Sequence, residues 1–393
     1  MAMMRRLFTE VVNVKHIIIV AISILFIVIF KMFLNLTFLN PVQRSMMNFR
    51  MTDIFYEISN SGDVRDTSDI ITIVDMTDVY ERSRLADILD TIKMYEPAIV
   101  GVDIVFDGLK GDTIGSERIA EIAFADDNVP IIWAKKLMDY NDSTNQFDRA
   151  ASSFFAEYAD VKEGYTNVMR DINGGTVRSF GIWRMAEGQK EYSLPAYVAA
   201  QYRGDAILAE AGANQSINYS DTYFPVLTPE EIKLHPELIR GHIVLFGAMH
   251  DEQDRHYTPI GRLAGVEILA YTVQTIVKHN GTKEVRAFNL WLITILLIWF
   301  FQMMSSLLQK RLLDSQRYVV KYLGTSGIGE SLFRFFFIFF LAYVCYVLFV
   351  DAAIYFNTAW AMAGIALLGN ARKWYAFIIN IKGLNIKHKK IKK

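Results

Sequence analysis

The stretches IITIVD (residues 70–75) and AIVGVDIVF (residues 98–106) decide the fold of the central part of this chain of 393 residues. Each is a short, almost continuously apolar run, which is typical of a strand buried on both faces of a sheet. The segment between them has apolar residues at helical spacing and ends before Pro97. Further strands are predicted at residues 130–134 and 242–247, and further helices at residues 116–125 and 264–277. This alternation predicts an α/β domain with a mostly parallel central sheet.

Four long apolar runs flank this domain. The first, IIIVAISILFIVIF at residues 17–30, carries no charge and, when extended to Leu34, reaches the length of about 20 residues that a membrane-spanning helix needs. No small-residue cleavage pattern follows it, so we expect an uncleaved anchor rather than a signal peptide. Three more runs lie at residues 288–308, 332–350 and 352–368. The sequence therefore predicts four transmembrane α-helices.

Lysine and arginine residues are concentrated on one side of these predicted helices. They precede the first run, lie between the second and third runs, and follow the last run, whereas the connection between the third and fourth runs has none. Because cytoplasmic segments carry an excess of these residues, we expect both termini in the cytoplasm. The predicted organisation in the cell (inner) membrane is a cytoplasmic tail (1–16), a first transmembrane helix (17–38), an extracytoplasmic, periplasmic domain (41–286), a three-helix transmembrane bundle (288–370) and a basic cytoplasmic tail (371–393).

The composition excludes several classes of protein and site. The formal net charge is only -1, which argues against nucleic acid as a partner. The single cysteine, Cys345, excludes an intrachain disulfide and every site that needs two or more thiolates. There is also no GxSxG or HExxH motif. We therefore expect no cofactor and no enzymatic activity.

Three aspartates mark the ends of the predicted parallel strands: Asp75 after IITIV, Asp103 within GVDIVFD, and Asp107 at its close. In open α/β sheets, ligands bind beyond the carboxyl ends of the strands, where carboxylates can bind a cation, an amine or sugar hydroxyls. The alternative is that Asp75 and Asp107 cap the following turn or helix. Asp103 lies in an apolar run and needs a partner if it is buried. Arg178 is a candidate partner, on a hairpin arm predicted at residues 176–183 after a turn at residues 173–175.

The loop GAMHDEQDRHYTP (residues 247–259) is rich in histidine and aspartate. The spacing of His250, Asp251, Asp254 and His256 matches no named zinc pattern, so a solvated loop is favoured over a metal site. We expect no bound metal here. Asp254 completes the set of candidate ligand-binding residues, which are Asp75, Asp103, Asp107, Arg178 and Asp254.

Five stretches together resemble the CHASE type 2 family of extracellular sensory domains, which are associated with bacterial cyclases and kinases. They are IITIVDMTDVYERSR, EPAIVGVDIVFDG, GYTNVMRDINGGTVRSF, YSLPAYVAAQ and RGHIVLFGAMHDEQDRHYTPIGRLAGVEILAYTVQTI, in this order between residues 70 and 276. The resemblance implies an extracytoplasmic sensor with one membrane span before it and three after it.

Two features depart from the family pattern. The Trp- and Pro-rich stretch that usually precedes the arginine of the first helix is only YERSR here (residues 80–84). A cytoplasmic output domain commonly follows the last span in this family, whereas about 23 residues follow it here, too few for a catalytic domain. We therefore expect any signal to pass through a separate protein.

The leading hypothesis is a membrane-anchored extracytoplasmic sensor or receptor without an output domain of its own. Its expected partners are the lipid bilayer, an unknown extracytoplasmic ligand or protein, and a separate cytoplasmic signalling protein; a homo-oligomer is left open. One alternative is a structural subunit of a cell-envelope complex, which a stoichiometric partner that survives detergent would favour. Another is an extracytoplasmic hydrolase, which turnover of ester, phosphate or glycan substrates would favour.

Overall fold

The computed structural model describes residues 13–34, 50–61, 66–109, 111–125, 128–158, 161–168, 175–204, 206–210, 212–220 and 222–391, the last eleven by their backbone alone. The chain divides into two compact units. The helical unit comprises Met1–Met51 and Lys283–Lys393, and the α/β unit comprises Thr52–Thr282. Residues 1–12 of the predicted tail, residues 35–38 of the first predicted span and residues 173–174 of the predicted turn lie outside the described residues.

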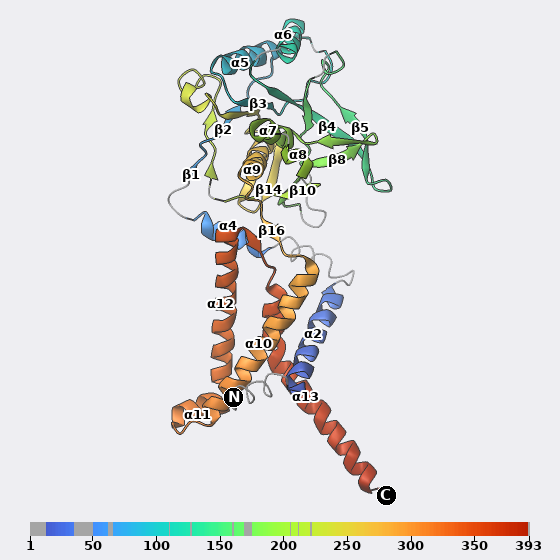
Figure 1. The fold of residues 1–393 in the computed structure, drawn as a ribbon, viewed down its shortest axis with the longest axis vertical. Coiled ribbons are helices and arrows are strands. Elements are labelled where there is room, and N and C mark those ends of the chain that lie inside the picture. Colours follow the sequence, from blue (N-terminus) through green and yellow to red (C-terminus); the bar gives the residue numbers. More distant parts are fainter. Residues whose placement is uncertain are drawn as a thin grey trace. The chain divides into compact units, whose positions relative to one another are not determined.

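Short helices and strands alternate through the α/β unit (Figure 1). Its helices are α4 (Met51–Ser59), α5 (Arg82–Met94), α6 (Thr113–Phe124), α7 (Leu194–Arg203), α8 (Ala206–Glu210) and α9 (Gly265–Lys278), with 3-10 turns at Pro236–Leu238 and Glu252–Asp254. Its strands are β1 (Asp66–Thr67), β2 (Ile71–Asp75), β3 (Ile99–Val102), β4 (Ile131–Asn141), β5 (Gln146–Ala151), β6 (Glu163–Tyr165), β7 (Ser179–Gly181), β8 (Trp183–Ala186), β9 (Gln189–Tyr192), β10 (Asn214–Ser216), β11 (Thr222–Tyr223), β12 (Val226–Leu227), β13 (Ile243–Gly247), β14 (Arg255–Thr258) and β15 (Gly261–Ala264). The helices and strands predicted from apolar runs are present, although β3 ends before Asp103.

The central sheet is mixed, which corrects the prediction of a mostly parallel sheet. Its order is β12-β2-β13-β3-β4-β5-β8-β9, with β6 also paired to β4. The strands from β12 to β4 are parallel neighbours, whereas β5 is antiparallel to β4 and β9 is antiparallel to β8. The cause is β4, which continues past the buried segment PIIWA to a length of 11 residues and folds back through the turn NDSTN. In this outer half of β4, Leu137 is buried while Lys136, Asp139 and Tyr140 are exposed, which fits an antiparallel arm that is partly in water.

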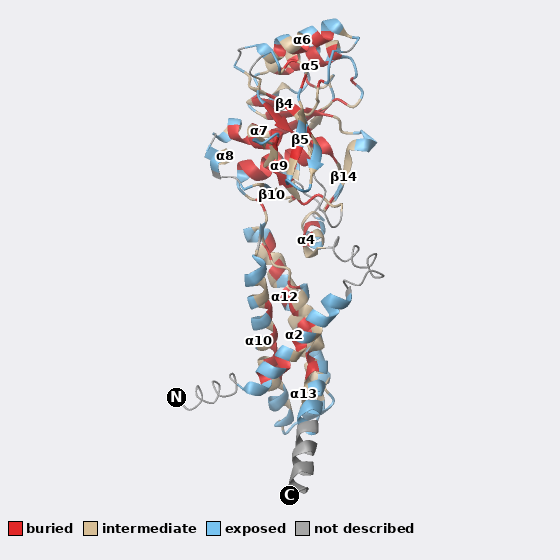
Figure 2. Cartoon of the chain, turned by 90° about the vertical axis from the view of Figure 1, so that its right-hand side faces the viewer, coloured by how far each residue is buried: buried red, intermediate tan, exposed pale blue. Residues whose placement is uncertain are grey.

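Helices cover the parallel strands on both faces, and the buried residues gather between them (Figure 2). Since side chains alternate along a strand, Val74, Val102 and Phe246 point to the face where α5 and α6 pack. Gly101 points to the other face, where an added Cβ atom would lie 3.1 Å from Val198 of α7. The row that contains Asp75 and Asp103 therefore lies on the face of α7 and α9.

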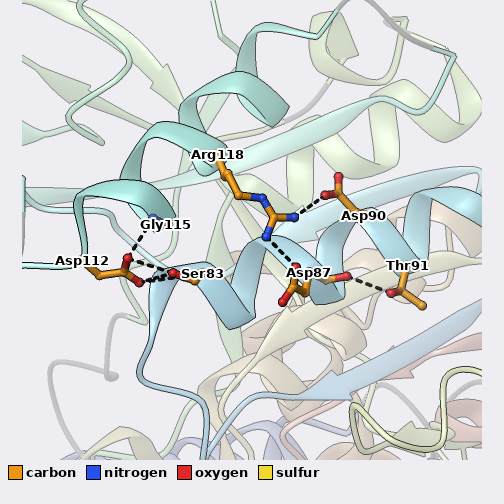
Figure 3. A network of polar contacts seen from close by, with 7 residues as sticks. All are labelled: Ser83, Asp87, Asp90, Thr91, Asp112, Gly115 and Arg118. Atoms are coloured by element: carbon orange, nitrogen blue, oxygen red, sulfur yellow. Dashed lines mark hydrogen bonds and ion pairs between the residues drawn. The ribbon is translucent and has the colours of Figure 1, made fainter.

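A polar network joins α5 to α6 (Figure 3). The carboxylate of Asp112, which caps α6, accepts hydrogen bonds from the backbone N–H of Ser83 at 2.8 Å and from its hydroxyl at 2.7 Å. Arg118 of α6 pairs with Asp87 at 2.5 Å and with Asp90 at 2.8 Å, both in α5. These contacts hold the two helices side by side on one face of the sheet.

The hairpin arm predicted at residues 176–183 is present in part, as β7. Its partner is the distant strand β10, which runs antiparallel to it, and the next strand, β8, pairs with β9. The residues after the predicted turn thus enter the fold through long-range pairing rather than through a local hairpin.

The helical unit contains α2 (Val14–Leu34), α10 (Ala287–Leu313), α11 (Tyr318–Thr325), α12 (Ile328–Ala352) and α13 (Ala359–Ile391), with the short parallel pair β16 (Lys283–Glu284) and β17 (Ile354–Tyr355). Within the described part of the chain, three helices are long and apolar enough to cross a membrane: α2, α10 and α12.

The fourth predicted span, residues 352–368, is not clearly present, which corrects the prediction of four. The chain leaves the helix at Ala353, which has a left-handed φ of 52°, and α13 starts only at Ala359. Arg372 and Lys373 then interrupt α13 after about 13 residues, fewer than the roughly 20 apolar residues of a membrane-spanning helix. The predicted run was thus divided between a turn and the first half of a longer, more polar helix.

Candidate functional site

A row of three residues crosses the carboxyl ends of the parallel strands. Asp75 ends β2 and lies opposite Gly247, the last residue of β13. Asp103 directly follows β3, and its backbone N–H donates to the carbonyl of Phe246 at 2.8 Å. Because adjacent strands are about 4.8 Å apart, the Cα atoms of Asp75 and Asp103 are about 10 Å apart across Gly247. The strand order thus brings together two of the predicted site residues at one edge of the sheet.

The N-terminus of α9 approaches this row through two glycines. A Cβ atom on Gly247 would lie 3.0 Å from the side chain of Val266, the second residue of α9. A Cβ atom on Gly265, the first residue of α9, would lie 2.2 Å from a carboxylate oxygen of Asp254. The absence of side chains on both glycines lets the sheet edge, the helix and the Asp254 carboxylate approach one another. A helix N-terminus, with its unpaired N–H groups, favours such a negative charge.

Asp103 and Asp254, here called the carboxyl pair, are near enough for the charge of Asp254 to act on Asp103. Burial, and secondly the charge of Asp254, raise the pKa of Asp103 to about 8, although a hydrogen bond with Thr166 lowers it. The carboxyl group of Asp103 is therefore protonated at neutral pH and can donate a hydrogen bond, while the residue keeps some exposed surface.

Two histidines lie against carboxylates of the site. Nε2 of His256 is 3.2 Å from Oδ1 of Asp254, and only 11% of the histidine side chain is exposed. Its Nδ1 is buried and has no hydrogen-bond partner among the described residues. Nε2 of His250 is 3.6 Å from Oδ2 of Asp75, on a side chain that is 70% exposed. Both imidazoles thus add ring nitrogens beside the carboxylates of the site.

Asp75 also holds the loop that follows β13. Its Oδ1 accepts hydrogen bonds from the backbone N–H and the hydroxyl of Thr77, at 2.9 and 2.5 Å, and from the N–H of Met249 at 3.0 Å. One oxygen of Asp75, Oδ1, therefore caps the following turn, as the alternative drawn from the sequence predicts. The other oxygen, Oδ2, faces His250.

The described residues contain no group of three or more His, Cys, Asp or Glu side chains arranged to hold a metal ion. In the loop after β13, His256 pairs with Asp254, while Asp251 accepts a hydrogen bond from the backbone N–H of Gln253 at 2.9 Å and so begins a 3-10 turn.

Residues 20–307 match the family model of the CHASE2 domain. The chain belongs to the CHASE2 family. CHASE2 is a family of extracellular sensory domains, and the three apolar helices fit a membrane protein with an extracellular segment. The match confirms the resemblance drawn from the five sequence stretches. No curated protein and no solved structure matches the chain significantly.

Asp107 of this CHASE2 chain lies away from the carboxyl pair, beside α5. The guanidinium of Arg82 donates to the backbone carbonyl of Asp107 at 3.3 Å and to the hydroxyl of Ser116 at 2.8 Å. The same guanidinium lies 5.1 Å from the ring centre of Phe154. The buried Arg82 thus joins the strand end, α5 and α6, and Asp107 is exposed at the rim of this cluster.

Arg178 is also remote from the carboxyl pair. It forms a bidentate pair with Asp53 of α4, with Nη2 at 2.7 Å from Oδ2 and Nε at 3.2 Å from Oδ1. Asp53, rather than Asp103, is therefore the carboxylate that it contacts. The hydroxyl of Tyr56, also in α4, donates to the carbonyl of Ile217 at 3.3 Å. These contacts fix α4 at the beginning of the CHASE2 α/β unit.

Sequence reasoning missed Thr166 and Gly265 as parts of the site, and it considered His256 only as a metal ligand. A signal for Gly265 exists in the stretch RLAGVEI, because Glu267 accepts from the backbone N–H of Ala264 at 2.8 Å, as in a capping box. Nothing local, however, indicates that the Asp254 carboxylate packs against this helix start.

Proposed function

We propose that this chain is a membrane-anchored sensor whose extracytoplasmic CHASE2 domain binds a small ligand at the carboxyl pair of Asp103 and Asp254. The observation that carries the proposal is the pairing of these two groups at the strand ends, with the pKa of Asp103 raised to about 8. Burying a carboxyl group beside a second one destabilises a fold, and such groups gather at functional sites. The family membership supports the sensory role.

The ligand that suits this pair carries a positive charge or several hydrogen-bond donors. An amine or another small cation interacts best with the ionised form of Asp103, so its binding lowers the pKa of this residue and releases a proton. The affinity for such a ligand therefore increases as the pH rises toward about 8. A ligand of this kind also pairs with the Asp254 carboxylate.

Helix α9 offers a route from the site to the end of the α/β unit. Its first residue, Gly265, contacts the Asp254 carboxylate, and its last residue, Lys278, lies just before the end of the unit at Thr282. The hydroxyl of Thr282 lies 3.2 Å from that of Tyr56, so the beginning and the end of the unit are hydrogen-bonded to each other. If the α/β unit has two conformations that differ in the position of α9, a ligand with different affinity for the two would shift the population between them.

The proposed topology places the α/β unit outside and the segment between α10 and α12 in the cytoplasm. This segment carries Arg317 and Lys321, and the last turn of α10 before it carries Lys310 and Arg311, which fits the excess of Lys and Arg in cytoplasmic segments. The pairing of β16, before α10, with β17, after α12, supports opposite directions for the two helices. The proposal includes a cell-membrane location, signalling through a separate protein and no catalysis by this chain.

The test is thermal unfolding of the full chain in detergent, with calcium chloride, ethanolamine or glucose as probes for a cation, an amine and sugar hydroxyls. We expect at least one probe to raise the Tm of the wild type. Asp103→Asn and Asp254→Asn should lose this shift, and the control Asp107→Asn, whose residue ends the same predicted strand but lies elsewhere, should keep it. Equal shifts in all variants, or no shift with any probe, would contradict the proposed site.

A further inference from the structure

A second polar site lies in the helical unit, between α2, α10 and α13. It is a cavity of about 300 Å³. Its polar lining includes Lys15, Gln302, Gln309, Arg372 and Asn380. The apolar side chains of Ile19 and Ile379 line it as well. None of the described residues that line it is acidic.

Arg372 is the centre of a network that joins three helices at one end of this cavity. Its Nε donates to Oε1 of Gln302 at 2.9 Å and its Nη2 donates to the hydroxyl of Ser305 at 3.0 Å, both in α10. Its Nη1 donates to Oε2 of Glu330 in α12 at 2.5 Å. Since a guanidinium has five N–H donors, these bonds leave two for a further acceptor. The network fixes the guanidinium in place at the cavity wall.

Among the described residues, the charges around the cavity do not balance. Glu330 pairs with Arg372 and also with Arg334, at 2.6 Å, so that two guanidinium groups share one carboxylate. Lys15 adds another positive charge at the cavity. An unbalanced positive charge among apolar helices is costly unless an anion pairs with it.

We propose that this cavity binds a phosphate group, either that of an anionic lipid headgroup or free phosphate. The ammonium of Lys15 and the remaining N–H groups of Arg372 supply charge-assisted hydrogen bonds, and the amides of Gln309 and Asn380 supply neutral ones. Lys15 lies just before the apolar part of α2. This is the position expected for lipid headgroups when α2 crosses the membrane. The apolar wall of Ile19 and Ile379 suits the start of an acyl chain, which favours the lipid as the source.

The experiment uses the full chain in neutral detergent and compares three additions: phosphatidylglycerol, phosphatidylcholine and sodium phosphate. Binding is followed by the shift in Tm and by native mass spectrometry of the lipid that remains bound. Lys15→Gln removes one exposed cation from the cavity, and Gln309→Glu adds an acid to it. Lys321→Gln, in α11, removes one exposed cation elsewhere and serves as the matched control.

We expect phosphatidylglycerol to raise the Tm of the wild type and of Lys321→Gln more than phosphatidylcholine does. Lys15→Gln should weaken this binding by about tenfold, the effect of one charge-assisted hydrogen bond, and Gln309→Glu should weaken it further. An equal, Lys15-dependent shift with sodium phosphate would support the phosphate site and assign it to the free anion. Equal responses of Lys15→Gln, Lys321→Gln and the wild type in every arm would overturn the proposal.

Discussion

Two aspartates of the α/β unit, Asp103 and Asp112, are held in opposite ways on opposite faces of one sheet. Asp112 begins α6, where hydrogen bonds from the Ser83 hydroxyl, the Ser83 backbone and the N–H of Gly115 lower its pKa. Asp103 follows β3, where burial and the charge of Asp254 raise its pKa to about 8. A carboxylate surrounded by donors holds the fold together, whereas a buried carboxyl group that faces a second one is a better candidate for binding.

The two aspartates also link stability to pH with opposite signs. The lowered pKa of Asp112 stabilises the folded state above the unfolded pKa of about 3.9, and this contribution is lost as the pH falls through the folded pKa. The raised pKa of Asp103 acts in the other direction, because the folded state keeps a proton that the unfolded state releases. Acidification should therefore remove the stabilising contribution of Asp112 between α5 and α6. It should also remove the destabilising contribution of Asp103.

The largest expected effect comes from a variant that disrupts the contact between α5 and α6 around Asp112. In Gly115→Ala, the added Cβ atom would lie 2.2 Å from the backbone nitrogen of Ser83, so α5 and α6 must move apart. We expect the free energy of unfolding to fall by about 3 kcal/mol, measured with denaturant on the full chain in detergent. Gly111→Ala is the matched control, since, apart from its chain neighbours, no atom of the described residues lies within 4 Å of its added Cβ. Equal stability of both variants would refute the close packing at Ser83.

The second prediction concerns the proton on Asp103. The stability of the wild type should fall between about pH 4 and about pH 8, by at most about 1.4 kcal/mol per pH unit for this group. Asp103→Asn should remove that contribution and gain stability relative to the wild type as the pH rises. Melting curves of both proteins across this range measure the difference, and parallel curves would show that Asp103 has no raised pKa.

A smaller effect is expected when only the neighbouring charge is removed. In Asp254→Asn, the pKa of Asp103 should fall below about 8 but stay above its usual range, because burial is the larger cause of the shift. The decline of Tm should therefore still begin near pH 4 but end at a lower pH, so the total loss across the range is smaller. An unchanged midpoint would mean that Asp254 does not face Asp103.

The smallest effect on stability is expected from a second glycine variant. In Gly265→Ala, the added Cβ atom meets the end of the Asp254 side chain rather than the backbone, so the carboxylate can move away. We expect a loss of less than about 1 kcal/mol, since alanine is also the better helix former. The pH midpoint should still shift, as in Asp254→Asn. A loss as large as that of Gly115→Ala would show that Gly265 serves packing alone.

The sequence was sufficient to predict the helices and strands with strong local patterns. It was also sufficient to predict which residues lie at the carboxyl ends of the parallel strands. The run IITIVD became β2, and the periodic apolar residues of 264–277 became α9. The position of Asp75 and Asp103 at one edge follows from parallel strands alone, because the carboxyl ends of such strands point the same way. The fold of the antiparallel arm could not be predicted, since it depends on how far β4 continues beyond its buried half.

The remaining parts of the site depend on contacts between distant residues. Arg178 and Asp53 are separated by 125 positions, and no local pattern links them. The approach of Asp254 to Gly265 requires the loop after β13 to return over α9, which only the folded chain shows. In the helical unit, Arg372 ended the predicted apolar region, but its partners Gln302 and Glu330 lie in other helices.

The most direct test of the carboxyl pair is the infrared spectrum of the full chain in detergent, recorded as a function of pH. At neutral pH, the wild type should show the carbonyl band of a protonated carboxylic acid that is absent from Asp103→Asn, and this band should vanish with an apparent pKa of about 8. The proposed site would be contradicted if the spectra of the two proteins did not differ in this band at neutral pH.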